Sequence, residues 1–325
     1  MREIENKIPN FLRDLIKYPE LFQKENRNIP FTIEEFEDIT NIVRDHLKDI
    51  SNLVILGDNF KDVLIIGDTH GFLESTLRII RPFLNGTVGS MLFLGDYVDR
   101  GPYSLLNLVL ILALMLAWPE RIGLLRGNHE NLEMNSIYGF KKELLLYYPS
   151  YDVKKVGELL DIIYEHLSLA AITPQESIAF HAGIPNVMNN INELKVIPKP
   201  HSLMIFRTSN AEMRNRAYRI FEQIQWNDPR EDQTSRFIKS FRGPNIYYFN
   251  YDVVKDFLKN SNLKRIVRAH ESSRGGFQKL FNGKLLHIFS TEPYFGKVSP
   301  AFVIHEQSDG KTILRDLDFN RVKEI

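Results

Sequence analysis

The segment Asp62-Val-Leu-Ile-Ile-Gly-Asp-Thr-His-Gly71 decides the fold, because a short apolar run ends abruptly in polar residues. The same arrangement returns in Met91-Leu-Phe-Leu-Gly-Asp-Tyr-Val-Asp-Arg-Gly101 and in Ile122-Gly-Leu-Leu-Arg-Gly-Asn-His-Glu130. Helical sequence follows each run: residues 72–81, then a helix through Trp118, then residues up to about Tyr148. Strand followed by helix, three times in succession, predicts βαβ units with parallel strands. Ligands of such folds gather beyond the carboxyl ends of the strands, so the three polar loops are expected to meet there.

The rest of the chain predicts elements that complete one or two sheets. Residues 1–60 are expected to be helical, with Thr32 as a helix N-cap and Glu35 completing a capping box. The apolar run Leu105–Trp118 is too short to cross a bilayer and predicts a buried helix that ends before Pro119. Further strands are expected at 168–172, 178–181, 264–269, 285–290 and 299–305.

The composition excludes several classes of protein. The 325 residues are 43% hydrophobic and 25% charged, which is typical of a globular protein with a sizeable core. Lys and Arg together number 41, as do Asp and Glu, so no net charge attracts nucleic acid or an anionic membrane. No cysteine is present, which excludes thiolate metal sites and a cysteine nucleophile. The charged N-terminal segment lacks the pattern of a signal peptide, so a cytoplasmic protein is expected.

The three polar loops offer ligands for a divalent cation. Asp68 and His70 follow the first run, Asp96 the second and Asn128 the third, each after a glycine that lets the backbone turn. One Gly-Asp turn or one lone histidine is more often structural. Three such loops in succession, joined by later histidines at predicted strand ends, indicate a metal centre instead. Carboxylate, amide and imidazole ligands without sulfur suit Mn, Fe or Zn. The later histidines are His181 and His270.

The sequence resembles the phosphoprotein phosphatase family, the serine/threonine phosphatases of the type 1, type 2A and calcineurin kind, within the calcineurin-like metallophosphoesterase superfamily. The resemblance rests on the motifs Gly-Asp-x-His-Gly, Gly-Asp-x-Val-Asp-Arg-Gly and Gly-Asn-His-Glu, and it extends over residues 62–296. It implies an α/β fold in which two mixed β-sheets pack as a sandwich flanked by helices. The metal site would lie at the carboxyl ends of strands. Further matching segments are Ile137-Tyr-Gly-Phe140, Phe180-His-Ala-Gly183, Trp226-Asn-Asp-Pro229, Arg242-Gly243, Arg268-Ala-His270, and Phe289-Ser with Tyr294.

A single catalytic domain is expected over residues 1–325, because no Pro-, Gly- or Ser-rich linker interrupts the chain. An N-terminal helical segment would occupy 1–60, the metallophosphatase core 61–305, and a C-terminal strand or tail 306–325.

The resemblance implies a centre of two divalent cations per chain, with Mn²⁺ expected in vitro and Fe or Zn as alternatives. Asp96 would bridge the two cations, and Asp68 and His70 would complete the first site. The remaining ligands of the second cation would be Asn128, His181 and His270. A hydroxide held between the cations would attack the phosphorus in line, without a covalent enzyme intermediate.

The resemblance also assigns the groups around the phosphate. His129 would protonate the leaving serine or threonine alkoxide as the general acid, and Asp99 would fix its tautomer. The role of Arg126 stays open, because it could bind phosphate or form a buried structural ion pair. Glu130 is expected to brace the ligands rather than act as a base. The groups expected to bind phosphate are Arg100, Arg242, Asn128 and Tyr294.

Several positions depart from the family pattern. Glu271 stands where glutamine is usual, and Asn227 stands where serine is usual. Glu292 lies in the loop before Tyr294, and three interpretations stay open: exposure to solvent, an ion pair with a cleft arginine, or repulsion of phosphate with recruitment of an extra cation. The basic segment 195–219 predicts a solvated face or, alternatively, a lip that favours acidic phosphopeptides.

The expected function is hydrolysis of phosphoserine and phosphothreonine in proteins. One alternative is a phosphodiesterase or dinucleotide-tetraphosphate hydrolase on the same fold, against which Trp226-Asn-Asp-Pro229 and Arg268-Ala-His270 speak. Another is a phosphoprotein-binding scaffold without activity, against which the complete ligand set and His129 speak. The expected partner is a phosphoprotein or phosphopeptide, with no nucleic acid and no membrane, and the sequence names no regulatory subunit.

Overall fold

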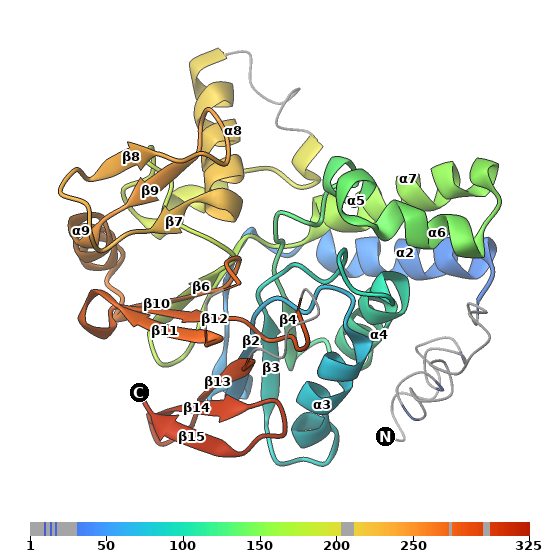
Figure 1. Ribbon diagram of the computed structural model, residues 1–325, viewed down its shortest axis with the longest axis horizontal. Coiled ribbons are helices and arrows are strands. Elements are labelled where there is room, and N and C mark those ends of the chain that lie inside the picture. Colours follow the sequence, from blue (N-terminus) through green and yellow to red (C-terminus); the bar gives the residue numbers. More distant parts are fainter. Residues whose placement is uncertain are drawn as a thin grey trace.

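The computed structural model describes Asn10, Asp14, Lys17 and residues 31–202, 211–272, 275–294 and 300–325. The part of the expected N-terminal helical segment before residue 31, apart from those three residues, therefore lies outside the described residues. The described chain forms two six-stranded sheets and one three-stranded sheet, with helices around them (Figure 1). None of the described helices has both the length and the apolar character required to cross a lipid bilayer.

One six-stranded sheet contains the three strands that precede the polar loops. Its members are β2 (Val63–Ile66), β3 (Ser90–Phe93), β4 (Ile122–Leu124), β13 (Phe302–Glu306), β14 (Thr312–Asp316) and β15 (Arg321–Glu324), in the order β15-β14-β13-β2-β3-β4. β2 pairs in parallel with β3, and β3 with β4, which confirms the predicted βαβ arrangement. The carboxyl ends of these strands therefore share one edge of the sheet.

The second six-stranded sheet supplies the later strands. Its members are β1 (Leu53–Ile55), β5 (Ala170–Ile172), β6 (Ser177–Phe180), β10 (Arg265–Arg268), β11 (Phe277–Leu280) and β12 (Leu285–Ile288), in the order β1-β5-β6-β10-β12-β11. The prediction of helix through residue 60 was wrong for β1, which pairs in parallel with β5. Its short Leu-Val-Ile run extends the sheet edge, and that tertiary pairing overrides the helical reading.

The two sheets face one another, and alternation along the strands shows how. Ile65 of β2 and Leu92 of β3 belong to the core cluster that also contains Val267 of β10. Leu64 and Ile66 instead join the cluster formed with the helices. Successive side chains on a strand point to opposite faces, so each sheet is covered on one face by the other sheet and on the second face by helices. The predicted sandwich is confirmed.

Helices cover the outer faces of the sandwich. Against the first sheet lie α2 (Ile33–Leu47), α3 (Leu73–Leu84), α4 (Ser104–Ala117), α6 (Phe140–Tyr147) and α7 (Ser150–His166). The short helix α5 (Leu132–Tyr138) contacts α6 and α7. Against the second sheet lie η3 (Ile191–Val196), α8 (Ala211–Trp226) and α9 (Tyr251–Ser261). Thr32 and Glu35 form the predicted capping box of α2. Two short 3₁₀ turns, η2 (Asp58–Phe60) and η5 (Phe281–Gly283), complete this part of the chain.

The three-stranded sheet stands beside α8 and α9 in the upper left of Figure 1. It consists of β7 (Asp228–Pro229), β9 (Tyr247–Phe249) and β8 (Phe237–Lys239), in that order. β8 and β9 form an antiparallel pair, and β7 pairs with β9 in parallel.

Candidate active site

The three polar loops meet, as expected, beyond the carboxyl ends of β2, β3 and β4. His181 follows β6 and His270 follows β10, so the second sheet contributes to the same place. The backbone N–H of His270 donates to Asp68 Oδ1 at 3.0 Å, and His181 Nδ1 donates to the carbonyl oxygen of Leu94 at 3.0 Å. These contacts join the two sheets at the site.

The site loops hold strained backbone conformations. His70, Asp96 and His270 have φ angles of 45°, 55° and 78°, a region that residues with a side chain rarely occupy. Such conformations each cost about 1–3 kcal/mol and persist only where the surrounding structure enforces them. Gly127 shows the crowding, because a Cβ there would lie 2.3 Å from Asp96 Oδ1. The loops are built for close approach of their side chains.

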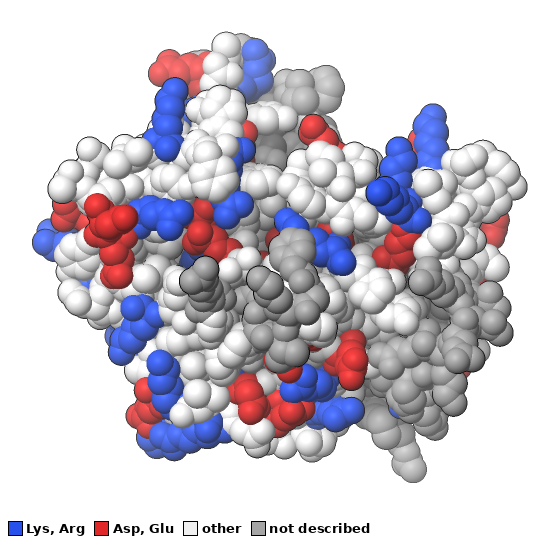
Figure 2. Space-filling view, in the orientation of Figure 1, with Lys and Arg blue, Asp and Glu red and all other residues white. Residues whose placement is uncertain are grey.

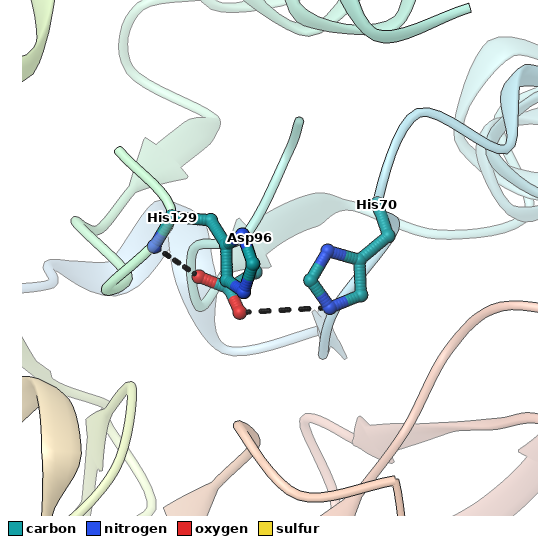
Figure 3. A group of neighbouring side chains, drawn as sticks. All are labelled: His70, Asp96 and His129. Carbon is teal, nitrogen blue, oxygen red and sulfur yellow. Dashed lines mark hydrogen bonds and ion pairs between the residues drawn. The ribbon is translucent and has the colours of Figure 1, made fainter. Parts of the chain in front are cut away.

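Two groups of buried side chains could each hold a metal ion, and Asp96 belongs to both. One group contains His70, Asp96 and His129 (Figure 3). The other contains Asp96, His181 and His270. Asp68, expected in the first group, lies beside it, with Oδ2 3.7 Å from His70 Nε2. Asp96 therefore occupies the position of a bridge between two sites.

Hydrogen bonds fix which nitrogen of each histidine faces the site. His70 Nδ1 lies 3.0 Å from the carbonyl oxygen of Val98, which can only accept, so Nδ1 carries the proton. Nε2 then presents a lone pair, 3.6 Å from Asp96 Oδ2. His181 repeats this arrangement, with Nδ1 on a carbonyl and Nε2 3.4 Å from Asp96 Oδ1.

Asn128 brings the second group together. Its Oδ1 lies 2.9 Å from His270 Nδ1 and 3.0 Å from His181 Nε2. Ligand atoms about 2.1 Å from a common ion lie about 3–3.5 Å apart, so these separations suit donors around one cation. Asp68 Oδ2 is buried without a hydrogen-bond partner, which is unusual for a polar atom. The donor set therefore fits divalent cations.

The electrostatics of these side chains lead to the same conclusion. Burial and the neighbouring Asp96 raise the pKa of Asp68 to about 6. Burial and His129 lower the pKa of His70 to about 3, which keeps its imidazole neutral and able to ligate. Burial alone would lower the pKa of His181, but the carboxylates of Asp96, Asp68 and Glu130 outweigh it and raise the value to about 9. A cation would relieve the repulsion between the carboxylates and displace the proton on His181.

Glu130 braces the loops, as predicted. Its carboxylate accepts hydrogen bonds from the backbone N–H groups of Asp96, Tyr97 and Gly127, at 2.8, 2.9 and 2.7 Å. The second and third loops are thereby tied together around one buried side chain. Burial and the nearby Asp96 raise the pKa of Glu130 to about 7.

Arg126 is buried against the protein, but its hydrogen-bond partners are a backbone carbonyl and an imidazole rather than the carboxylate of the expected ion pair. Its guanidinium donates to the carbonyl oxygen of Glu130 at 2.9 and 3.2 Å and to His201 Nδ1 at 2.7 Å. The side chain is buried and does not line the cavity described below. It clamps the turn that carries Asn128 and His129.

His129 is held by two further polar side chains. Its Nδ1 lies 2.8 Å from Asp99 Oδ2. Asn135 of α5 donates to the same carboxylate oxygen at 3.0 Å and to the carbonyl oxygen of His129 at 2.8 Å. Asn135 was not singled out from the sequence, and nothing in its local sequence distinguishes it from a helical surface residue.

A cavity of about 250 Å³ opens over the ligands. Its lining includes all four side chains that were expected to bind phosphate, which are Arg100, Asn128, Arg242 and Tyr294. The Arg100 guanidinium lies over the Tyr138 ring, with Cζ 4.4 Å from its centroid. Tyr138, Trp226 and Ser272 also line the cavity and were missed. Tyr138 and Trp226 lie within motifs that carried the resemblance, which is the signal that could have found them.

A buried ionic network supports Arg242. Asp228 accepts from Arg242 Nε at 2.7 Å and from Arg268 at 2.9 Å. Arg268 also donates to Glu271 at 2.8 Å, and burial raises the pKa of Glu271. The unusual glutamate therefore neutralises a fully buried arginine rather than facing the phosphate cavity.

The expected pairing of Glu292 with a cleft arginine was wrong, and its side chain is only 24% exposed rather than free in solvent. Its carboxylate pairs with Arg78 of α3, at 2.5 Å, and Arg78 does not line the cavity. An electrostatic effect of Glu292 on phosphate or on an extra cation stays a prediction. The basic segment 195–219 lies partly outside the described residues. Within α8, Arg216 pairs with Glu193 and Arg219 donates to Asn186 at 2.8 Å, so these two cations are engaged by the protein itself.

Comparison with known proteins agrees with this geometry. Residues 61–273 match the family model of calcineurin-like phosphoesterases. Over 275 residues, 82% of this chain, the sequence is 31% identical to a protein phosphatase 2A catalytic subunit of Dictyostelium discoideum and covers 83% of it. It is 30% identical over 249 residues to a serine/threonine-protein phosphatase of Arabidopsis thaliana. Those residues are 74% of this chain but only 23% of that longer relative.

The solved structures give the same result. A protein serine/threonine phosphatase of Saccharomyces cerevisiae, similar to human phosphatase PP5, matches with a TM-score of 0.73 at 26% identity. The match covers 92% of this chain and 89% of that one. The fold and the paired ligand groups thus define a metallophosphoesterase. The chain belongs to the calcineurin-like phosphoesterase family, and its relatives include that family's serine/threonine protein phosphatases.

Proposed function

We propose that this chain is a metal-dependent serine/threonine protein phosphatase. One observation carries the proposal: two buried ligand groups share Asp96 and open onto a cavity that also holds two arginines and His129. Hydrolysis of a phosphate monoester needs metal ligands, cationic groups that bind the phosphoryl oxygens and a proton donor for the leaving group, all in one place. The named activity of the relatives supports the same reaction class.

Two divalent cations fit the donor set. Asp68, His70 and Asp96 would hold one, and Asp96, Asn128, His181 and His270 would hold the other. When bound, such a pair supplies an activated water and compensates the charge of the phosphoryl oxygens. Mn²⁺ is the proposed activator in vitro, with Fe or Zn as alternatives. The cytoplasmic location and the single-domain organisation remain predictions.

The chain's own residues account for binding and proton transfer. Arg100 and Arg242 would bind the phosphoryl oxygens, since planar guanidinium groups match them in bidentate fashion. Asn128 and Tyr294 complete the lining around the same group. His129 would donate a proton to the alkoxide that leaves, so that water and phosphoserine give serine and inorganic phosphate. Asp99 keeps the imidazole oriented for this donation.

A substrate panel tests the proposal. Phosphoserine, phosphothreonine and phosphotyrosine peptides and a dinucleotide tetraphosphate would be incubated with the protein, with and without Mn²⁺, and phosphate release measured. We expect Mn²⁺-dependent release from the phosphoserine and phosphothreonine peptides. Cleavage of the dinucleotide alone would replace the proposal with the dinucleotide hydrolase alternative, and binding of phosphopeptides without release would replace it with the scaffold alternative.

A further inference from the structure

An aromatic side chain stands exposed at the edge of the cavity. Phe241 is 85% exposed, and the next residue, Arg242, lines the cavity. Both lie in the turn that joins β8 to β9. The Arg242 guanidinium carbon is 5.9 Å from the centroid of the Phe241 ring. Removing an exposed phenylalanine side chain from water is favourable, so a ligand that covered Phe241 would gain binding free energy at the mouth of the site.

Neighbouring apolar side chains extend this surface. Ile238 and Tyr248 are directly opposite one another in the β8–β9 pair, so their side chains share one face of the sheet. The Tyr248 ring centroid lies 6.4 Å from that of Phe241, and Ile238 is 44% exposed. We call Ile238, Phe241 and Tyr248 the apolar shelf. In Figure 2 much of the surface over β8 and β9 is uncharged, and both basic and acidic side chains lie around it.

The shelf is fixed relative to the phosphate cavity. Ser240 pairs with Ile246 across the turn, through a backbone hydrogen bond of 2.9 Å. Arg242 is held by its 2.7 Å contact with Asp228, which is itself buried. Arg230 covers one side of the shelf, with Cζ 4.5 Å from the Tyr248 ring centroid. These contacts hold the backbone that carries Phe241 beside the phosphate cavity.

We propose that the apolar shelf binds a large apolar side chain of the phosphoprotein substrate, close in sequence to the phosphorylated residue. The proposal rests on the proposed phosphatase function, because it places the phosphoryl group at Arg242. An extended peptide advances about 3.3 Å per residue, so an adjoining surface is reached within about one to three residues. The substrate class is thus a phosphoserine or phosphothreonine segment with a leucine- or phenylalanine-like neighbour.

Two phosphoserine peptide sets test the shelf. In one set leucine occupies a single position, from three before to three after the phosphoserine, and in the other alanine replaces it. The unaltered protein should prefer at least one leucine peptide by about 5- to 10-fold in kcat/KM, as expected for partial burial of one side chain. Phe241→Ala should remove that preference, and Phe241→Leu should retain most of it. Hydrolysis of p-nitrophenyl phosphate should not change in either variant.

Tyr151→Ala provides the matched control, because Tyr151 of α7 is 76% exposed and does not line the cavity. This variant should keep the preference for leucine. A preference that survives Phe241→Ala, or no preference at any position in the unaltered protein, overturns the shelf and leaves the phosphatase proposal intact. No release from any phosphopeptide overturns both proposals.

Discussion

His129 lies between two carboxylates, and that position decides its protonation. Burial would lower the pKa of His129, but Asp96 and the hydrogen-bonded Asp99 outweigh burial and raise it. The raised pKa favours the imidazole that carries both protons. It can then donate from Nε2 while Nδ1 stays on Asp99.

Replacing His129 with asparagine tests the proton donor. We expect His129→Asn to lower kcat on a phosphoserine peptide by about 10²–10⁴-fold, the usual range for loss of general acid catalysis. The loss on p-nitrophenyl phosphate should be much smaller, because that leaving group scarcely needs protonation. Steady-state kinetics on both substrates measure the contrast. Equal losses would show that His129 organises the ligands instead.

Some site residues can be predicted from sequence and others cannot. Asp68, Asp96 and Asn128 each lie in a local motif directly after an apolar run, so position and chemistry coincide in one segment. Asn135 acts through its contact with Asp99, which is distant in the chain. No local pattern encodes such contacts.

At the scale of elements, the loop between β12 and β13 is clamped to α3. Ser75 Oγ lies 2.9 Å from the carbonyl oxygen of Glu292 and accepts from its N–H at 3.1 Å. Arg78 binds the Glu292 carboxylate and both carboxylate oxygens of Asp318, each of the latter at 2.8 Å. The clamp places Tyr294 against His70, with ring centroids 5.7 Å apart.

Loosening this clamp should weaken phosphate binding without removing metal. We expect Arg78→Ala to raise the inhibition constant of inorganic phosphate by about 2- to 10-fold, since small displacements of positioning groups are costly. Metal content should stay the same. Lys154→Ala, at an exposed position of α7, serves as the control and should change neither quantity. An unchanged inhibition constant in Arg78→Ala would show that the loop keeps its position without the clamp.

The start of α4 depends on a carboxylate from another helix. Tyr103 provides no side-chain cap, and Glu143 of α6 accepts instead from the N–H groups of Ser104 and Leu105, at 2.7 and 2.9 Å. Burial raises the pKa of Glu143 from 4.5 to about 7. The folded state therefore holds this proton between about pH 4.5 and 7, while the unfolded state releases it.

This difference predicts a pH-dependent loss of stability. As pH rises through that window, the free energy of unfolding falls by up to about 3 kcal/mol through Glu143, because the pKa of this carboxyl is higher in the folded than in the unfolded state. Glu143→Gln should remove this loss. Denaturant unfolding of both proteins at pH 5 and pH 8 should give similar free energies at pH 5 and a more stable variant at pH 8. Parallel changes in the two proteins would contradict the account.

At the scale of the whole molecule, long periodic patterns were predictable and short elements were not. The strands before the three loops and the apolar helix α4 follow from runs of sequence that are visible alone. β7 has two residues and β8 has three, too few to show alternation. They form because β9 pairs with both, and the apolar shelf therefore became visible only in the structure.

The central claim is that two cations sharing Asp96 drive the hydrolysis. The most direct measurement is phosphate release from a phosphoserine peptide by metal-stripped protein, titrated with Mn²⁺ and normalised to bound metal. We predict no release without metal, a maximum at two bound ions per chain, and no recovery in Asp96→Asn at any Mn²⁺ concentration. Full release by the stripped protein, or recovery in Asp96→Asn equal to that of the unaltered protein, would contradict the claim.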